Sequence, residues 1–337
     1  MPVMNNKQFF ESLGQQHVMI VGDVMIDAYM WGDVTRISPE APVPIVSITR
    51  REQRLGGAAN VALNIHSMGA KPIICSVLGN DDHNKEFQKI MYGYDMDKRG
   101  IITSDVRRTT VKSRVIGNKM HIVRVDEEDT MPLNNNDEEA LLDRVRRILK
   151  QVPVSAIIFQ DYDKGVITPH VIDAVTEMAR KKNIITTVDP KHRNFSHYHD
   201  VTLFKPNLKE LREGLNIEID DSSVESLRHD LGRAAQIIHD QQHVEIVLIT
   251  LGDKGVFLCD FRGSEPQTLI LPAQLRSVAD VSGAGDTVIS VATLALAAGL
   301  PVEQVGNLAN HAGGIVCEQV GVVPIDCQRL QEETANE

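Results

Sequence analysis

Short apolar runs alternate along the chain with longer stretches in which apolar residues recur every three or four positions. Short runs bounded by turn residues are typical of buried strands, and the longer period is typical of helices with one buried face. The predicted strands lie at residues 17–24, 73–78, 101–104, 156–160, 184–189, 201–204 and 244–250. The predicted helices lie at residues 58–69, 82–92, 137–150, 169–182, 288–300 and 302–317. Strands that alternate with helices predict an α/β fold with a mainly parallel sheet.

Two segments interrupt this alternation. Residues 29–50 contain Pro39, Pro42 and Pro44 followed by an apolar/polar alternation, which restricts them to edge strands or an extended loop. Residues 107–126 contain two alternating strands around Gly117 and Asn118, which predicts a hairpin. We interpret the two segments together as a small β lid over a ligand site. A surface loop without function is the alternative for the proline-rich segment.

Length and composition restrict the class of protein. The chain has 337 residues, of which 42% are hydrophobic, so it can bury a large core as one large domain or two ordinary ones. Its net charge of -11, without a long Lys/Arg block, argues against nucleic acid or an anionic membrane as a partner. Residues 1–16 are polar, and no run of about 18 apolar residues occurs. We therefore expect a cytoplasmic protein, with buried thiols at Cys75, Cys259, Cys317 and Cys327.

A polar, glycine-rich turn at residues 279–287 leads directly into the apolar run at residues 288–300. We expect Ser282 to cap the helix, and Gly283 and Gly285 to let the backbone approach a ligand. The start of such a helix binds anions. The carboxylate of Asp286 fits beside an anion if it accepts a proton from a nucleophile that attacks the anion. The turn therefore predicts a phosphoryl-transfer centre; a capped helix with an acidic first turn is the alternative.

Polar residues follow several predicted strands. Asp23 and Asp27 follow the first strand, residues 161–165 follow the fourth, and residues 189–193 follow the fifth. The carboxyl ends of parallel strands meet at one edge of a sheet, so we expect these residues to share one site. His192, His197 and His199 also lie here, but their spacing does not fit one helical face and a zinc site is not expected.

Asn207 and Glu210 lie three residues apart at the start of a helix that follows the strand at residues 201–204. This spacing predicts a capping box, in which each side chain bonds the backbone of the other residue.

Residues 280–286 (DVSGAGD) resemble the C-terminal signature of the ribokinase, or phosphofructokinase-B, family of sugar kinases. The resemblance covers nearly the whole chain and implies a single ribokinase-like domain at residues 1–337, with a central mainly parallel sheet, flanking helices and the β lid. It also implies that the amides of Gly283, Ala284 and Gly285 form an anion hole and that Asp286 is the base. No P-loop motif and no complete dinucleotide fingerprint is present.

Two further stretches, GDVMID at residues 22–27 and RISPEAPVPIV at residues 36–46, resemble the bacterial heptose-7-phosphate kinases of this family. The implied reaction is ATP-dependent phosphorylation of D-glycero-β-D-manno-heptose 7-phosphate at O1, in ADP-heptose and lipopolysaccharide core biosynthesis. The alternatives are another sugar kinase, of ribokinase or fructokinase type, and a non-catalytic regulator. About 50 residues follow Asp286 without a His-x-Gly-His motif, so we expect a kinase alone.

Site residues are assigned from the resemblance and from strand ends. The expected sugar contacts are Asp27, Asp23, Gly56, Gly57 and Asn60. Lys191 and Arg193 are the favoured contacts for the sugar phosphate because strand-end residues are held rigidly, and Lys112 and Arg114 of the lid are the alternative. The expected nucleotide contacts are Lys205, Asn207, Thr250, Gly252, Gly255 and Asn310. Asn207 and Glu210 are expected to organise Mg²⁺ and its waters, whereas a monovalent cation near Asp280 and Ser282 is left open. The lid predicts a homodimer, because open edge strands need a partner.

Overall fold

The computed structural model describes residues 5–118, 120–274 and 276–335, and these contain a main sheet of nine strands in the order β13-β12-β11-β10-β9-β8-β1-β4-β5. Seven strands are parallel, and they confirm the seven predicted strands. The antiparallel strands β12 and β13 extend one edge and are not predicted by the pattern. The strands are β1 His17–Gly22, β4 Lys71–Gly79, β5 Ile101–Ser104, β8 Val154–Gln160, β9 Ile185–Asp189, β10 Leu203–Phe204, β11 Ile246–Thr250, β12 Val256–Asp260 and β13 Gln267–Leu271.

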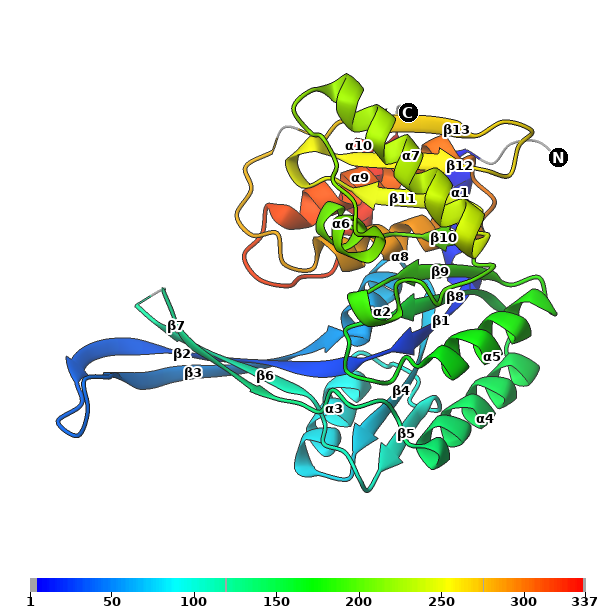
Figure 1. Cartoon of the computed structure of the whole chain (residues 1–337). Coiled ribbons are helices and arrows are strands. Elements are labelled where there is room, and N and C mark those ends of the chain that lie inside the picture. Colours follow the sequence, from blue (N-terminus) through cyan, green and yellow to red (C-terminus); the bar gives the residue numbers. More distant parts are fainter. Residues whose placement is uncertain (1–4, 119, 275, 336–337) are drawn as a thin grey trace.

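Helices cover both faces of this sheet, so the strands are apolar on both sides (Figure 1). In β1, Val18 and Ile20 belong to one buried cluster, whereas Met19 and Val21 belong to the other. The first cluster includes residues of α1 Asn6–Ser12, α2 Ala58–Ser67, α3 Asp82–Gly93, α8 Ala284–Ala297, α9 Val302–Cys317 and α10 Cys327–Glu333. The second includes residues of α4 Asn135–Gln151, α5 Pro169–Arg180, α6 Leu208–Leu215 and α7 Val224–Gln242. Burial on both faces explains the continuous apolar runs of the parallel strands.

Four strands form a second sheet, which we call the β arm. They are β2 Val24–Ile37, β3 Pro44–Gly57, β6 Val111–Gly117 and β7 Met120–Glu127, in the order β3-β2-β6-β7. Figure 1 shows the β arm extending sideways from the body. The hairpin of β6 and β7 confirms the prediction around Gly117. The proline-rich segment is more regular than predicted, because Pro39 and Pro42 fall in the turn and Pro44 is the first residue of β3.

Candidate active site

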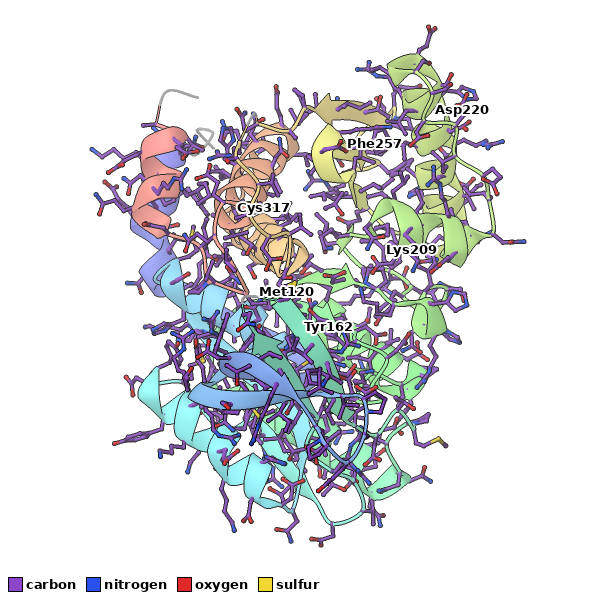
Figure 2. The ribbon with its side chains drawn as sticks, turned by 90° about the vertical axis from the view of Figure 1, so that its left-hand side faces the viewer. Met120, Tyr162, Lys209, Asp220, Phe257 and Cys317 are labelled. Carbon is purple, nitrogen blue, oxygen red and sulfur yellow. The ribbon has the colours of Figure 1, made fainter. Side chains whose placement is uncertain are left out.

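The candidate site lies at the carboxyl edge of the main sheet, where β1 lies between β4 and β8 and the strand order reverses. Open α/β sheets bind ligands at such a point, because the loops that leave the neighbouring strands there diverge to opposite faces. Helix α8 begins at this edge, and Figure 2 shows Tyr162 near the middle of the face seen from the side of the β arm.

The turn before α8 differs from the sequence prediction at one residue. The N-cap of α8 is Gly283, with φ of 81°, and its missing Cβ permits this left-handed conformation. Ser282 is therefore not the cap; its backbone N–H donates to Asp280 Oδ1 at 2.9 Å. The side chain that accepts a backbone N–H in this turn is therefore Asp280 and not Ser282. A Cβ at Gly285 would lie 3.6 Å from Lys205 Nζ, so the start of α8 faces a buried ammonium group.

The carboxylate of Asp286 is buried in the first turn of α8 and is held by three side chains. Asn60 Nδ2 donates to Oδ2 at 2.7 Å, Tyr162 Oη donates to Oδ1 at 2.7 Å, and Gln160 Nε2 donates to Oδ1 at 3.1 Å. Burial raises the pKa of Asp286 to about 6, against the opposing effect of the hydrogen bond from Asn60. This value places the carboxyl near the pH range in which a general base works.

A second layer of charge surrounds Asp286. The Lys205 Nζ pairs with Asp189 Oδ1 at 3.1 Å, and both side chains are almost fully buried. Gln160 Nε2 also donates to Asp189 at 3.2 Å, so one amide group links two carboxylates. Lys191 Nζ pairs with Glu210 and lies 5.7 Å from the ring centre of Tyr162. Burial lowers the pKa of Lys191, but Asp189 and Glu210 outweigh this effect and the pKa is raised overall, so the ammonium stays charged.

Asp23 and Asp27, the two carboxylates near the end of β1, have different partners. Asp23 is buried and accepts the backbone N–H groups of residues 162, 164 and 166 at 2.9 to 3.1 Å. Burial nevertheless raises the pKa of Asp23. Asp27 lies in β2 and pairs with Arg114 at 2.5 Å. Gly56 lies directly beside it, since a Cβ there would collide with Asp27 Oδ2, and Gly57 begins α2 with φ of 61°. Asp23 therefore fixes a loop, whereas Asp27 lies at the base of the β arm.

At the start of α6, Asn207 and Glu210 form the predicted capping box. Asn207 Oδ1 accepts the Glu210 N–H at 2.9 Å, and Glu210 Oε2 accepts the Asn207 N–H at 2.9 Å. Thr250, at the end of β11, pairs with Asn207 in a parallel bridge. Gly252 and Gly255 bound the short turn after β11, and Asn310 of α9 donates to the carbonyl of Pro272 at 2.8 Å. No group of three or more His, Cys, Asp or Glu that could hold a metal ion occurs among the residues that the structure describes.

The basic residues expected to bind phosphate do not form one cluster, because they have different partners. Lys191 lies beside Tyr162 and Glu210, whereas Arg193 is exposed and donates to the carbonyl of Thr130 at 2.7 Å. The structure therefore does not place Lys191 and Arg193 together. Lys112 pairs with Asp126 at 2.9 Å and with Glu128 at 3.0 Å.

Lys164, which the sequence analysis does not single out, pairs with the same Glu128 at 2.8 Å. Lys112, Lys164 and Arg193 thus surround residues 126–130.

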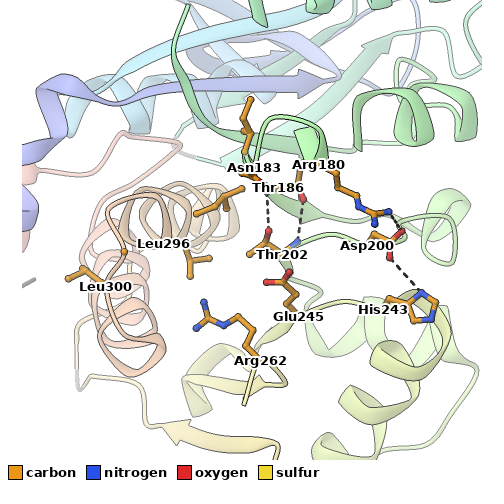
Figure 3. Close-up of a pocket in the computed structure, with 13 residues that line it drawn as sticks. Arg180, Asn183, Thr186, Asp200, Thr202, His243, Glu245, Arg262, Leu296 and Leu300 are labelled. Carbon is orange, nitrogen blue, oxygen red and sulfur yellow. Dashed lines mark hydrogen bonds and ion pairs between the residues drawn. The ribbon is translucent and has the colours of Figure 1, made fainter. Parts of the chain in front are cut away.

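A pocket of about 510 Å³ lies at the amino ends of the parallel strands, which we call the amino edge of the sheet, between the start of β9 and the end of α8 (Figure 3). In its lining, Arg180 pairs with Asp200 at 2.7 Å, and His243 Nδ1 lies 3.7 Å from the same carboxylate. Burial raises the pKa of Glu245 in this pocket. None of the site residues assigned above appears in its lining. Its volume therefore does not mark the candidate active site.

Gln160 is the contact of Asp286 that sequence reasoning missed, whereas Tyr162 was expected at this edge among residues 161–165 but was given no role. The one available signal was a glutamine at the end of an otherwise apolar strand, at the edge where a site was expected. A buried polar side chain at such a position needs a partner.

Comparison with known proteins identifies sugar kinases. The family described as pfkB family carbohydrate kinase matches residues 15–326. The bifunctional protein HldE of Methylobacillus flagellatus is 38% identical over 321 residues, which cover 94% of this chain and 62% of that protein. The bifunctional protein HldE of Helicobacter pylori strain J99 is 33% identical over 304 residues, 90% of this chain and 63% of that protein. The chain thus spans less than two thirds of the length of these curated relatives.

Two solved structures show the same fold. The phosphofructokinase-2 from Escherichia coli in complex with potassium has a TM-score of 0.74 at 20% identity, covering 95% of this chain and 98% of that chain. The ribokinase of Arabidopsis thaliana complexed with ribose and ATP has a TM-score of 0.67 at 17% identity, covering 94% and 98%. These similarities confirm the predicted ribokinase-like fold.

Proposed function

The chain belongs to the pfkB family of carbohydrate kinases, and from this premise we propose that it transfers the γ-phosphoryl group of ATP to O1 of D-glycero-β-D-manno-heptose 7-phosphate. The observation that carries the proposal is the buried Asp286 carboxylate at the start of α8, beside the Lys205 ammonium group. The identity of 33 to 38% with proteins named HldE supports a heptose phosphate as the sugar. The product would be the 1,7-bisphosphate, used for the inner core of lipopolysaccharide.

In the proposed reaction, the sugar hydroxyl gives its proton to Asp286 while its oxygen attacks the γ-phosphorus. The bond from that phosphorus to the β,γ-bridging oxygen breaks, and ADP leaves with the electron pair. The backbone amides of Gly283, Ala284 and Gly285 would stabilise charge on the transferred group. Lys205 would add a fixed positive charge, since its ammonium lies close to the position of Gly285.

Mg²⁺ is the metal that we propose for the nucleotide phosphates, where it would neutralise part of their charge. Glu210 and Asn207 present hard oxygen ligands at the start of α6, and each oxygen that already accepts one hydrogen bond has a further lone pair. These residues would hold the ion's water shell. Asp280, whose carboxylate already orders the turn before α8, is the residue that a monovalent cation would use.

The sugar phosphate, in our proposal, binds among Lys112, Lys164 and Arg193 around residues 126–130. Lys112 and Lys164 share the Glu128 carboxylate, and both side chains are mostly buried. Arg193 is exposed and bonded only to a backbone carbonyl among its described contacts, so it can turn toward a ligand. Charge-assisted contacts to phosphate are stronger than neutral hydrogen bonds, so a local group of cations favours phosphate binding even in a chain with a net charge of -11.

We further propose that the β arm acts as a lid and pairs with the β arm of a second copy. Met120, Val123 and Val125 of β7 are exposed, as are Ile37 and Val43 near the tip. An exposed edge strand with apolar side chains favours pairing with another chain. Light scattering at micromolar concentration should give a dimer, and lysine at Val123 and Val125 should shift it toward the monomer. A wild-type monomer would contradict this assignment.

A cytoplasmic location fits this proposal, because ATP is the co-substrate and the four cysteines are free thiols. No helix among the described residues is long and apolar enough to cross a membrane.

The test of the proposed function is coupled ADP release with heptose 7-phosphate, compared with ribose and fructose 6-phosphate. We expect heptose 7-phosphate to have the highest kcat/KM. Higher kcat/KM with ribose or fructose 6-phosphate would assign the chain to another sugar kinase of this fold. Absence of ADP release with every sugar would favour a non-catalytic regulator.

A further inference from the structure

The two oxygens of the Asp286 carboxylate differ in their hydrogen bonds. Oδ1 accepts from Tyr162 Oη at 2.7 Å and from Gln160 Nε2 at 3.1 Å, whereas Oδ2 accepts from a single group among the described residues, Asn60 Nδ2 at 2.7 Å. A carboxylate oxygen has two lone-pair sites in its plane. The protein therefore saturates Oδ1 and leaves one lone pair free on Oδ2.

Asn60 gives a second observation on the same side. Its side chain is almost fully buried in α2, and its Oδ1 has no hydrogen-bond partner in the described structure. A buried amide oxygen without a partner costs free energy unless a ligand supplies the donor. The free lone pair of Asp286 Oδ2 and the unpaired oxygen of Asn60 thus belong to two side chains that touch each other.

From this geometry we infer that Oδ2 of Asp286 is the atom that accepts the proton of the reacting hydroxyl, and that Tyr162 and Gln160 are positioning residues that hold Oδ1. The inference rests on the proposed function. In the step, the substrate O–H bond breaks and the proton forms a bond with Oδ2, while the substrate oxygen forms the bond to phosphorus. An adjacent substrate hydroxyl donates to Asn60 Oδ1.

The groups that face Asp286 come from four elements. Burial is the largest cause of the raised pKa of Asp286. Asp189, the last residue of β9, raises it further, whereas the hydrogen bonds of Asn60 and Tyr162 and the charge of Lys205, which follows β10, lower it. Burial raises the pKa of Tyr162 well above its usual range, so its hydroxyl remains a donor. Lys191 faces the same carboxylate and remains charged. Tyr162 therefore keeps Asp286 ionised without itself exchanging a proton.

The test is Tyr162→Phe, with Gln160→Met as a second variant that removes the other donor to Oδ1. We expect the acid limb of the kcat profile to move up by about one pH unit, which lowers the rate about tenfold on that limb. The alkaline plateau and the KM for ATP should stay within about twofold of wild type. A fall of the plateau by tenfold or more would overturn the inference, because it would place Tyr162 or Oδ1 in the proton transfer itself.

Tyr198→Phe is the matched control. Tyr198 is also a buried tyrosine that donates to a carboxylate, Asp161 Oδ2, at 3.0 Å, but it does not contact Asp286. The acid limb of the kcat profile of Tyr198→Phe should match that of the wild type.

A measurement on the free protein separates this inference from the proposed substrate. Carbon-13 NMR of aspartate-labelled protein, with the Asp286 signal assigned by its loss in Asp286→Asn, should show a titration midpoint about one pH unit higher in Tyr162→Phe. An unchanged midpoint would overturn the role of Tyr162 even if the kinase reaction is correct. A shifted midpoint without ADP release from any sugar would instead count against the proposed function alone.

Discussion

The two edges of the main sheet both carry clusters of charged residues, but they hold their charges differently. At the carboxyl edge, Asp286 is buried, and burial raises its pKa to about 6. At the amino edge, Arg180 and Asp200 line a pocket of about 510 Å³, yet they are 64% and 39% exposed. Burying a charge costs free energy, whereas an exposed ion pair costs and contributes little. The edge at which we propose the active site is therefore distinguished by its buried charges and not by pocket volume.

The largest effect should come from Asp286→Asn, which removes the proposed base at the carboxyl edge. We expect kcat to fall by about 10² to 10⁴-fold, the usual contribution of a general base. Binding of ATP, followed by calorimetry, should remain. Asp200→Asn is the control at the amino edge and should leave kcat unchanged. Near-wild-type turnover of the Asp286 variant would remove this residue from the mechanism.

The same variant should also stabilise the fold at neutral pH. The pKa of Asp286 is raised from the ordinary 3.8 of an aspartate to about 6 in the folded protein, so the folded state binds the proton more tightly than the unfolded state. Stability therefore falls as pH rises from about 4 to 6, and the cost persists above that range. Asp286→Asn should raise the free energy of unfolding by about 1 to 3 kcal/mol at pH 8. Urea unfolding at pH 8 and pH 4 would measure this, and an equal difference at both values would contradict it.

A smaller effect is expected where the β arm meets the carboxyl edge. Lys112→Ala should lower kcat/KM for the phosphorylated sugar by about 10- to 100-fold, because one charge-assisted contact to phosphate is lost. The preference over the unphosphorylated sugar should shrink by the same factor. Arg124→Ala is the matched control, since Arg124 also pairs with Asp126 but is 58% exposed. Retention of the full preference in Lys112→Ala would move the phosphate to other cations, Lys191 first.

Glu210→Gln tests the metal side of the same edge. We expect the Mg²⁺ concentration for half-maximal rate to rise about tenfold, with little change in the KM for the sugar, since residues around a metal's water shell affect its affinity on this scale. Glu213→Gln is the control, because Glu213 lies in the same helix but pairs with Lys209 on the exposed surface. An unchanged Mg²⁺ titration would leave Glu210 with its capping role alone.

The smallest effect belongs to the amino edge. Arg180→Ala breaks the exposed pair with Asp200 and should change the free energy of unfolding by no more than about 1 kcal/mol. Its kcat and both KM values should match wild type in the coupled assay. A loss of activity beyond twofold would show that the pocket in Figure 3 takes part in the reaction and would remove the contrast between the edges.

The elements that could be predicted from the sequence are those whose burial leaves a clear pattern. The parallel strands are covered on both faces and read as continuous apolar runs, and the glycine-rich turn before α8 has its own motif. The pattern does not predict α1, α7, α10, β12 or β13. β13 is half-buried at the sheet's edge, and α7 carries charged residues along much of its length, so their apolar signals are weak.

The site was predictable only as far as single motifs reach. Asp286 lies in such a motif, but its contact with Tyr162 joins residues 124 positions apart and depends on the order of the strands. Nothing in the sequence around Asp23 indicates that its carboxylate accepts the backbone N–H groups of residues 162, 164 and 166. Ser282 was expected to cap α8 from its residue type. In the structure, Asp280 accepts the backbone N–H of Ser282 through Oδ1 and that of Gly321 through Oδ2, because a carboxylate has two acceptor oxygens.

A single residue, Asp23, joins β1 of the main sheet to β2 of the β arm, and its carboxylate accepts the backbone N–H of Tyr162. Asp23 is therefore a candidate pivot for movement of the β arm. β2 has 14 residues, and at about 3.3 Å per residue it is roughly 46 Å long. With this length, a rotation of about 6° about Asp23 would move the tip by about 5 Å, but it would displace atoms within about 5 Å of Asp23 by only about 0.5 Å. A lid movement that is wide at the tip is therefore compatible with an almost stationary Tyr162 and Asp286.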